Sequence, residues 1–242
     1  MSTSRRRAAG VTADSRTRYM DAAEALFIER GYRGTAIRDV AQRANSHLGT
    51  LHYFWGNKDA LFRAVCARRF DPIQAEQLRR LGACRAAGPG SAAGDLAAVV
   101  RALVEPPLLV AGADAAEGDT VRLLYGRALT EPSPVVMRSV REQFRASTRL
   151  FVALLRARCR NLDAQQFYWR LTCALGAFIF TQSFGDRVAF ASGRRLGPVD
   201  WTQVAAEVTG FVVRGMDAPA TRVTPAAPVV RARRRAGRRR AP

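Results

Sequence analysis

Histidine is almost absent from this chain. The two that occur, His47 and His52, lie five positions apart, so no Ser-His-acid triad can be assembled elsewhere in the sequence. Neither a Walker phosphate loop, a GxGxxG fingerprint nor an HExxH zinc motif is present. The sequence therefore predicts a protein that is not an enzyme and that needs no cofactor and no metal.

Cysteine and long apolar runs are also scarce. The 242 residues include four cysteines, and these form no CxxC pair and no metal-ligand spacing, as is typical of reduced thiols. No apolar run approaches the roughly 18 residues of a membrane span, and the Arg-rich start is not followed by the apolar segment of a signal peptide. We therefore expect a cytoplasmic protein.

Lysine and acidic residues are few, whereas arginine is abundant. Lys58 is the only lysine, and 39 basic residues against 20 acidic ones give a formal charge of +19. Eight of the arginines, and no acid, lie in residues 219–242, which leaves 31 basic against 20 acidic residues, or +11, in the rest of the chain. This excess favours a polyanionic partner such as DNA, because neutralised phosphates supply most non-specific affinity.

No segment alternates like a β-strand, and apolar residues recur at helical spacing instead, so we predict an all-α fold of nine to ten helices. Prolines mark the expected helix breaks. Asp71-Pro72 is expected to end or kink one helix, and Pro106-Pro107 to stop another. The remaining boundaries follow from caps and glycines. The expected helices cover residues 15–31, a pair within 35–56, 58–70, 73–86, 96–105, 120–130, 135–159, 164–184 and 199–214.

The stretch from Thr35 to Leu61 reads as two short helices joined by a tight turn and followed by the start of a third. Thr35 can cap the first short helix, and Ser46 or His47 can cap the second. Asn45 suits the left-handed backbone of a sharp helix exit. Such a pair forms a helix-turn-helix, which a basic protein uses to enter the DNA major groove.

This region resembles the TetR (tetracycline-repressor-like) family of bacterial transcriptional regulators, through AAEALFIERGYRGTAIRDVAQRA and then GTLHYFWGNKDAL. Three positions depart from the family pattern: Asn45 replaces the usual glycine, Ser46 a small apolar residue and Trp55 a phenylalanine. The resemblance implies an N-terminal three-helix DNA-binding domain and a C-terminal helical domain for ligand binding and dimerisation.

The resemblance also implies which residues meet DNA. Thr35 and Arg38 would hold phosphates, as would Tyr53 and Lys58, while His47 and Thr50 would face base edges. His52 stands where the family often has tyrosine, so packing is as good an interpretation for it as DNA contact. The expected set is Thr35, Arg38, Ser46, His47, Gly49, Thr50, His52, Tyr53 and Lys58.

Two further surfaces follow from the same family. The last two helices are expected to form the dimer interface, through Phe167, Leu171, Leu175, Trp201, Val204, Val208 and Phe211. RLLYGRALTEPSP and RLTCALGAF resemble the C-terminal domain of the fatty-acid-sensing branch, which implies an apolar cavity for a small apolar or amphipathic ligand such as a fatty acid or acyl derivative. The expected lining is Leu123, Leu124, Tyr125, Val140, Phe144, Phe151 and Phe178, although ordinary core packing would use the same side chains.

The expected domains are a disordered basic arm (1–14), the helix-turn-helix domain (15–62), the ligand-binding and dimerisation domain (63–217) and a disordered Arg-rich tail (218–242). The resulting hypothesis is a homodimeric regulator, a repressor that a ligand releases from a palindromic operator. An activator would use the same fold. The alternative from another class is an architectural protein that coats nucleic acid without sequence preference, driven by its Arg-rich tails.

Overall fold

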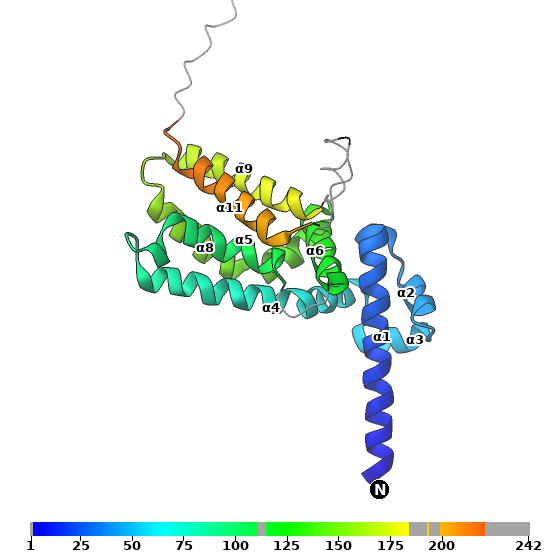
Figure 1. Ribbon diagram of the computed structural model, residues 1–242. Coiled ribbons are helices and arrows are strands. Elements are labelled where there is room, and N and C mark those ends of the chain that lie inside the picture. Colours follow the sequence, from blue (N-terminus) through cyan, green and yellow to red (C-terminus); the bar gives the residue numbers. More distant parts are fainter. Residues whose placement is uncertain (1, 111–114, 184–192, 194–198, 221–242) are drawn as a thin grey trace, which may run out of the picture.

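A computed structural model describes residues 2–110, 115–183, 193 and 199–220 (Figure 1). Every regular element in these ranges is helical, which confirms the all-α prediction. A single 3-10 turn, η1 (Ala92–Gly94), accompanies the α-helices. These are α1 (Ser2–Gly34), α2 (Ile37–Arg43), α3 (Leu48–Trp55), α4 (Lys58–Ala87), α5 (Leu96–Leu108), α6 (Ala115–Thr130), α7 (Pro134–Gln143), α8 (Arg145–Arg158), α9 (Ala164–Ser183) and α11 (Trp201–Asp217).

The first three helices form a small unit at one end of the molecule (Figure 1). Its core contains Tyr19, Leu26, Val40 and Leu51, all fully or almost fully buried. Gly31 interrupts α1 with a φ of +71°, which confirms the predicted end of the first long helical segment. A Cβ at Gly31 would also lie 2.5 Å from a carboxylate oxygen of Glu131, so this position needs glycine for two reasons.

α4 joins this unit to the rest of the chain as one helix of 30 residues (Figure 1). Of the two alternatives predicted at Asp71-Pro72, an end or a kink, the helix end is therefore wrong. Proline removes one backbone hydrogen bond, but Phe70 and Ile73 on either side are buried and keep both halves of α4 packed in register. The boundary expected near residue 62 consequently lies inside a continuous helix.

α5 also continues through a predicted stop, because Pro106 and Pro107 form part of its last turns. Pro107 occupies the position whose N–H would normally donate to the carbonyl oxygen of Leu103, four residues earlier. Gln77 on α4 supplies the missing donor, with Nε2 lying 2.9 Å from that oxygen. The side chain of one helix thus completes the hydrogen bonding of its neighbour, which the sequence pattern alone does not reveal.

We expect Gln77→Met to lower the free energy of unfolding by about 1–3 kcal/mol, because it leaves the buried Leu103 carbonyl without a donor. In a Pro107→Ala background, the new backbone N–H can donate to the same carbonyl, so the cost of Gln77→Met shrinks. Urea denaturation of the wild type, Gln77→Met, Pro107→Ala and the double variant measures the cost of Gln77→Met in both backgrounds. An equal cost in the two backgrounds would show that Gln77 does not replace the lost helical bond.

Three further boundaries differ from expectation. The single helix expected over 135–159 is divided into α7 and α8 at Phe144, whose φ of −98° and ψ of 12° depart from helical geometry while its side chain stays buried. α6 begins at Ala115, earlier than the expected start near residue 120. α1 begins at Ser2 and runs through residues 2–14, which were expected to be a disordered arm. Its Ala- and Arg-rich sequence is compatible with a helix. The expected tail and the 184–198 connection lie almost wholly outside the described residues.

Candidate DNA-binding surface and ligand cavity

The turn between α2 and α3 has the geometry that the sequence predicts. Asn45 has a φ of +46°, and α3 starts after His47, although neither Ser46 nor His47 caps it through a side chain. The buried phenol oxygen of Tyr19 lies 2.7 Å from Ser46 Oγ and 2.6 Å from the carbonyl oxygen of His47. A phenol has one hydrogen, so Tyr19 donates to the carbonyl and accepts from the serine. This pairing explains how a polar residue is accommodated at position 46, and sequence reasoning missed it.

α3 presents one face to the core and the other to solvent. Leu51 is fully buried, whereas His47, Gly49 and His52 are exposed and the Tyr53 side chain is 84% exposed. Gly49 has open space around it. Thr50 is half-buried on the same helix. This is the arrangement that a recognition helix requires, with small and polar side chains facing outward. Leu48, the first residue of α3, is 40% exposed.

Thr35 is a correction to the expected DNA-binding set. It does not cap α2, whose N-cap position is Ala36. Its side chain is fully buried, and its hydroxyl lies 3.1 Å from the carbonyl oxygen of Leu26 and 2.8 Å from that of Gly31. Thr35 therefore closes the end of α1 and is not available to a phosphate.

Lys58, another member of the expected set, has partners within the protein. Its ammonium donates to the carbonyl oxygens of Tyr32 at 3.0 Å and Thr35 at 3.1 Å, and it lies 4.2 Å from the centroid of the Tyr32 ring. This lysine holds the α1–α2 connection against the start of α4. The expected phosphate contact of Lys58 stays a prediction beside this structural role.

Arg38 and His52 retain surface positions. The Arg38 side chain is 84% exposed at the start of α2, with Asp39 Oδ1 at 3.6 Å. His52 Nδ1 lies 2.8 Å from the carbonyl oxygen of Gly56, so this nitrogen carries the hydrogen and orients the ring along the end of α3. His52 thus combines a structural bond with exposure of its ring.

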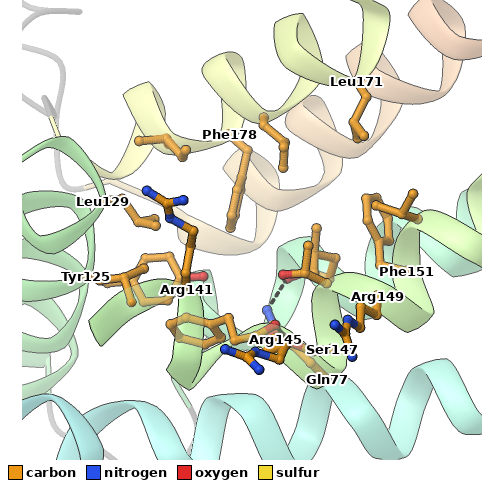
Figure 2. Close-up of a pocket in the computed structure, with 17 residues that line it drawn as sticks. Gln77, Tyr125, Leu129, Arg141, Arg145, Ser147, Arg149, Phe151, Leu171 and Phe178 are labelled. Carbon is orange, nitrogen blue, oxygen red and sulfur yellow. Dashed lines mark hydrogen bonds between the residues drawn. The ribbon is translucent and has the colours of Figure 1, made fainter. Parts of the chain in front are cut away.

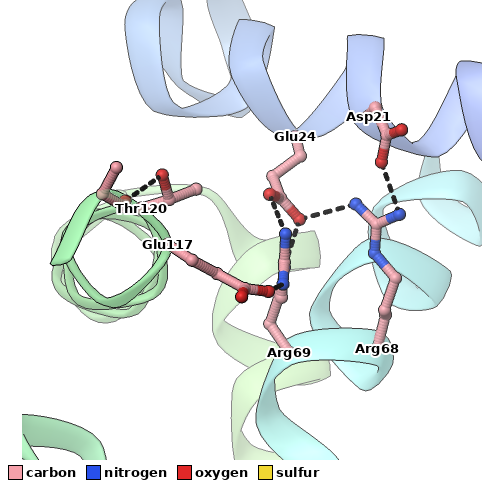
Figure 3. Close-up of polar contacts among 7 residues, drawn as sticks. Asp21, Glu24, Arg68, Arg69, Glu117 and Thr120 are labelled. Atoms are coloured by element: carbon pink, nitrogen blue, oxygen red, sulfur yellow. Dashed lines mark hydrogen bonds and ion pairs between the residues drawn. The ribbon is translucent and has the colours of Figure 1, made fainter. Parts of the chain in front are cut away.

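An ion-pair cluster connects the DNA-binding unit to the rest of the chain (Figure 3). Glu24 on α1 is buried and accepts hydrogen bonds from Arg69 at 2.8 Å and from Arg68 at 2.7 Å, both on α4. Arg68 also pairs with the exposed Asp21, and Arg69 with Glu117 on α6. Burial disfavours ionised Glu24, but the hydrogen bonds from Arg69 and Arg68 outweigh it and hold the pKa of this carboxyl below its usual value.

α6 makes a second contact with α1. The backbone N–H of Tyr32 donates to a carboxylate oxygen of Glu131, just beyond the end of α6, at 3.3 Å. Between Glu117 and Glu131, the same helix places Tyr125 and Leu129 on the wall of a cavity (Figure 2). One helix therefore touches both the cavity and the DNA-binding unit.

The cavity has a volume of about 620 Å³ and lies among α4, α5, α6, α7, α8 and α9. Most of its wall is apolar, and Figure 2 shows Phe178 and Leu171 projecting from α9 toward it. Burial raises the pKa of the Tyr125 phenol well above its usual range, with Gln77 partly opposing this shift, so Tyr125 remains neutral. The volume falls within the range of roughly 300–1,000 Å³ that is usual for small-molecule sites.

Five of the seven residues expected to line this cavity do so: Tyr125, Val140, Phe144, Phe151 and Phe178. The other two are corrections. Leu123 is on the exposed side of α6, and Leu124 is buried in the core away from the cavity. On a helix, neighbouring residues point about 100° apart, so three consecutive positions cannot share one wall. Arg141, Arg145 and Arg149 were not among the expected residues but line the cavity as well.

The expected dimer residues differ in how far the protomer itself covers them. Phe167, Leu171 and Val208 are buried, and Leu175, Trp201 and Val204 are half-buried, because α9 and α11 pack against each other and against α5 and α6. Phe211 is largely exposed. The large apolar side chains of these two helices that stay exposed are Tyr168, Trp169, Phe180 and Phe211, a set that we call the aromatic face.

The described residues contain neither a membrane-spanning helix nor a metal-binding cluster. No helix in the described ranges is both long and apolar enough to cross a bilayer. Among the same residues, no group of three or more His, Cys, Asp or Glu side chains is arranged to hold a metal ion.

Comparisons with known proteins agree with this geometry. Among solved structures, a TetR-like transcriptional regulator from Rhodococcus sp. RHA1 has 22% sequence identity and a TM-score of 0.51, covering 84% of this chain and 95% of that one. NalD from Pseudomonas aeruginosa, the secondary repressor of the MexAB-OprM multidrug efflux pump, has 20% identity and a TM-score of 0.53, covering 84% and 97%.

FadR from Bacillus subtilis, solved in complex with stearoyl-CoA, has 15% identity and a TM-score of 0.55, covering 82% of this chain and 98% of that one. At these identities the likeness shows the fold. No curated protein matches the chain.

Two family matches cover the two parts of the molecule. Residues 20–65, from α1 to the start of α4, match the bacterial regulatory proteins of the tetR family. Residues 101–215, from α5 to α11, match the tetracyclin repressor-like C-terminal domain. Members of this family are non-enzymatic DNA-binding regulators. The chain belongs to the TetR family of transcriptional regulators.

Proposed function

We propose that this regulator is a homodimeric repressor that binds a palindromic operator and is released by an amphipathic effector in its cavity. The observation that carries the proposal is the outward-facing surface of α3, held by Tyr19 and Leu51, on a chain that also contains an apolar cavity of about 620 Å³. A single recognition helix reads only a few base pairs, so useful specificity requires two copies. Family membership also favours a specific regulator over a nucleic-acid-coating protein.

The proposed DNA contacts are divided by their chemistry. His47 and Thr50 would read base edges, with Gly49 allowing close approach of the backbone. Arg38 and Tyr53 would hold phosphates, which position the protein but carry no sequence information. Ser46 and His52 would support the helix through their own hydrogen bonds.

The effector would release the protein from its operator by acting through α6. An effector that fills the cavity contacts Tyr125 and Leu129, and the same helix is bonded to α1 and α4 through Glu117 and Glu131. A ligand shifts the protein between two geometries only if it binds one of them more tightly. We propose that the bound form holds α6 where the two recognition helices no longer match adjacent turns of the operator.

The proposed effector has an apolar chain and an acidic group, as in a fatty acid or an acyl derivative. The apolar wall suits the chain, and the arginines at 141, 145 and 149 suit the acid. The stearoyl-CoA complex of FadR, which shares this fold, is consistent with such a ligand.

Substitutions in and around α2 and α3 test the DNA contacts. His47→Ala and Thr50→Ala are each expected to weaken operator binding by roughly ten- to hundred-fold, because a good base contact contributes about 1–3 kcal/mol of discrimination. Arg38→Ala should weaken binding to every sequence about equally and lower the salt slope by about one. Fluorescence anisotropy with operator and scrambled duplexes separates these effects.

Arg138→Ala, on the exposed surface of α7, is the matched control and should bind like the wild type. If His47→Ala and Thr50→Ala affected operator and scrambled DNA equally, α3 would not be reading bases.

A further inference from the structure

We propose that the cavity contains a polar subsite, formed by Gln77 and Tyr125, that binds a neutral hydroxyl group on the apolar part of the ligand. The inference rests on the proposed ligand-binding function and deepens it, because it adds an alcohol or a phenol to the groups that the effector carries. Gln77 comes from α4 and Tyr125 from α6, and both line the cavity (Figure 2). The subsite consists of one hydrogen-bond acceptor and one donor.

The acceptor is Oε1 of Gln77. The orientation of this amide is fixed, because Nε2 donates to the carbonyl oxygen of Leu103 at 2.9 Å and exchanging the two amide atoms would bring two acceptors together. The Gln77 side chain is 1% exposed, and its Oε1 is buried without a hydrogen-bond partner in the described part of the chain. A buried acceptor without a donor costs free energy, so this atom favours a ligand that donates to it.

The donor is the hydroxyl of Tyr125. This residue is buried, and its hydroxyl donates no hydrogen bond to any of the described residues. The Gln77 amide partly offsets the rise that burial causes in the pKa of the Tyr125 phenol, which indicates that the two side chains lie close together. Ser147, another buried polar residue of the lining, already donates to the carbonyl oxygen of Phe144 at 3.2 Å. Gln77 and Tyr125 therefore keep hydrogen-bonding capacity for a ligand.

The chemistry of these two groups selects a hydroxyl. A hydroxyl oxygen accepts from Tyr125 while its hydrogen is donated to Gln77, so one ligand atom satisfies both partners. A carboxylate only accepts, and its charge would lie beside the Gln77 oxygen in an apolar cavity. An ammonium only donates and would leave Tyr125 without an acceptor. The arginines that suit the acidic group of the effector are exposed, so the hydroxyl and the acid belong to different parts of the ligand.

Two probes with the same alkyl chain test the subsite by isothermal titration calorimetry on the full-length protein. The hydroxyl of para-hexylphenol both donates and accepts, whereas the methyl ether of para-hexylanisole keeps the accepting oxygen and lacks the donor. Both probes are uncharged at neutral pH. Wild-type protein is expected to bind the phenol at least roughly ten-fold more tightly, because a site built to receive a hydrogen bond rejects an analogue that cannot donate it.

Variants assign this preference to Gln77. In Gln77→Met/Pro107→Ala the new backbone N–H takes over the bond to Leu103 while Oε1 is lost, so the preference should disappear from a protein that urea denaturation shows to be folded. Pro107→Ala alone is the matched control. It lies outside the lining and should keep the preference. Tyr125→Phe should weaken both probes, because the phenol and the ether oxygen each accept from Tyr125.

Equal affinity of the wild type for the two probes would overturn the inference. So would a preference for the phenol that survives in Gln77→Met/Pro107→Ala, or failure of both probes to bind. Dodecanoic acid, which carries an acidic group and no hydroxyl, tests the effector proposal separately: if it binds and the phenol does not, the inference falls and the effector proposal stands. Because operator binding is measured without ligand, it distinguishes any of these results from failure of the regulator proposal itself.

Discussion

Replacing Trp169 and Phe211 together with glutamate is expected to separate the dimer into folded monomers and to weaken operator binding by roughly a hundred-fold or more. Their side chains are 65% and 61% exposed in the protomer, on neighbouring helices, so the substitutions remove little of the protomer's own core. We propose that the aromatic face is the dimer interface, so four negative charges would then meet across a surface that is otherwise apolar and buried between two copies. A monomer carries one recognition helix and loses most of the margin of specific over non-specific binding, which is typically at least 10³.

Sedimentation velocity measures the mass and anisotropy measures the affinity of the same samples. Met137→Glu is the control, because it adds a charge to an apolar side chain of similar exposure on α7, outside the aromatic face. It should leave both values unchanged. A dimer of unaltered stability in the double glutamate variant would place the interface elsewhere.

Glu24→Ala is expected to lower the free energy of unfolding by about 3 kcal/mol, the largest effect of any single substitution considered. It removes a buried carboxylate that two arginines share and leaves their partly buried guanidinium groups with only the more exposed partners Asp21 and Glu117. The matched control is Asp21→Asn, which removes an exposed partner of Arg68 and should cost less than 1 kcal/mol. Urea denaturation at neutral pH compares the two, and an equal loss in both would contradict the role assigned to burial.

The same cluster predicts a pH dependence. Because the pKa of Glu24 is lower in the folded protein than in the unfolded chain, its contribution to stability is complete above the unfolded value near 4.5. It is lost as the pH falls through the folded value. Stability of the wild type should therefore decline in acid more steeply than that of Glu24→Ala. Parallel curves would show that this carboxyl is not the group responsible.

Local features such as helix caps and the turn of the helix-turn-helix were predictable from sequence because they depend on neighbouring residues. Asn57, Asp95 and Asp163 each accept a hydrogen bond from the backbone N–H three residues later, as their positions before apolar helices indicate. The left-handed Asn45 follows equally from local backbone preference. The all-α fold is the sum of such signals.

The predictions from sequence were wrong where the structure depends on contacts between residues far apart in the chain. Pro107 signals a helix end, but Gln77, thirty residues earlier, replaces the lost donor. Thr35 has the residue type of a phosphate contact, yet its hydroxyl is buried in the folded chain and donates to the end of α1. α9 is apolar on more than one side, so the sequence does not indicate which side faces the protomer's own core. The structure assigns Phe167 to that core and leaves Trp169 exposed.

In the proposed function, two copies of α3, mounted on one dimer, read two halves of a DNA site. This can be measured by selecting binding sites from random duplex DNA with the full-length protein and footprinting the selected sites at moderate salt. We expect an enriched inverted repeat, protected in both halves, whose centres lie about one helical turn or a multiple of it apart. Recovery of no common sequence, with affinity that follows salt alone, would contradict it.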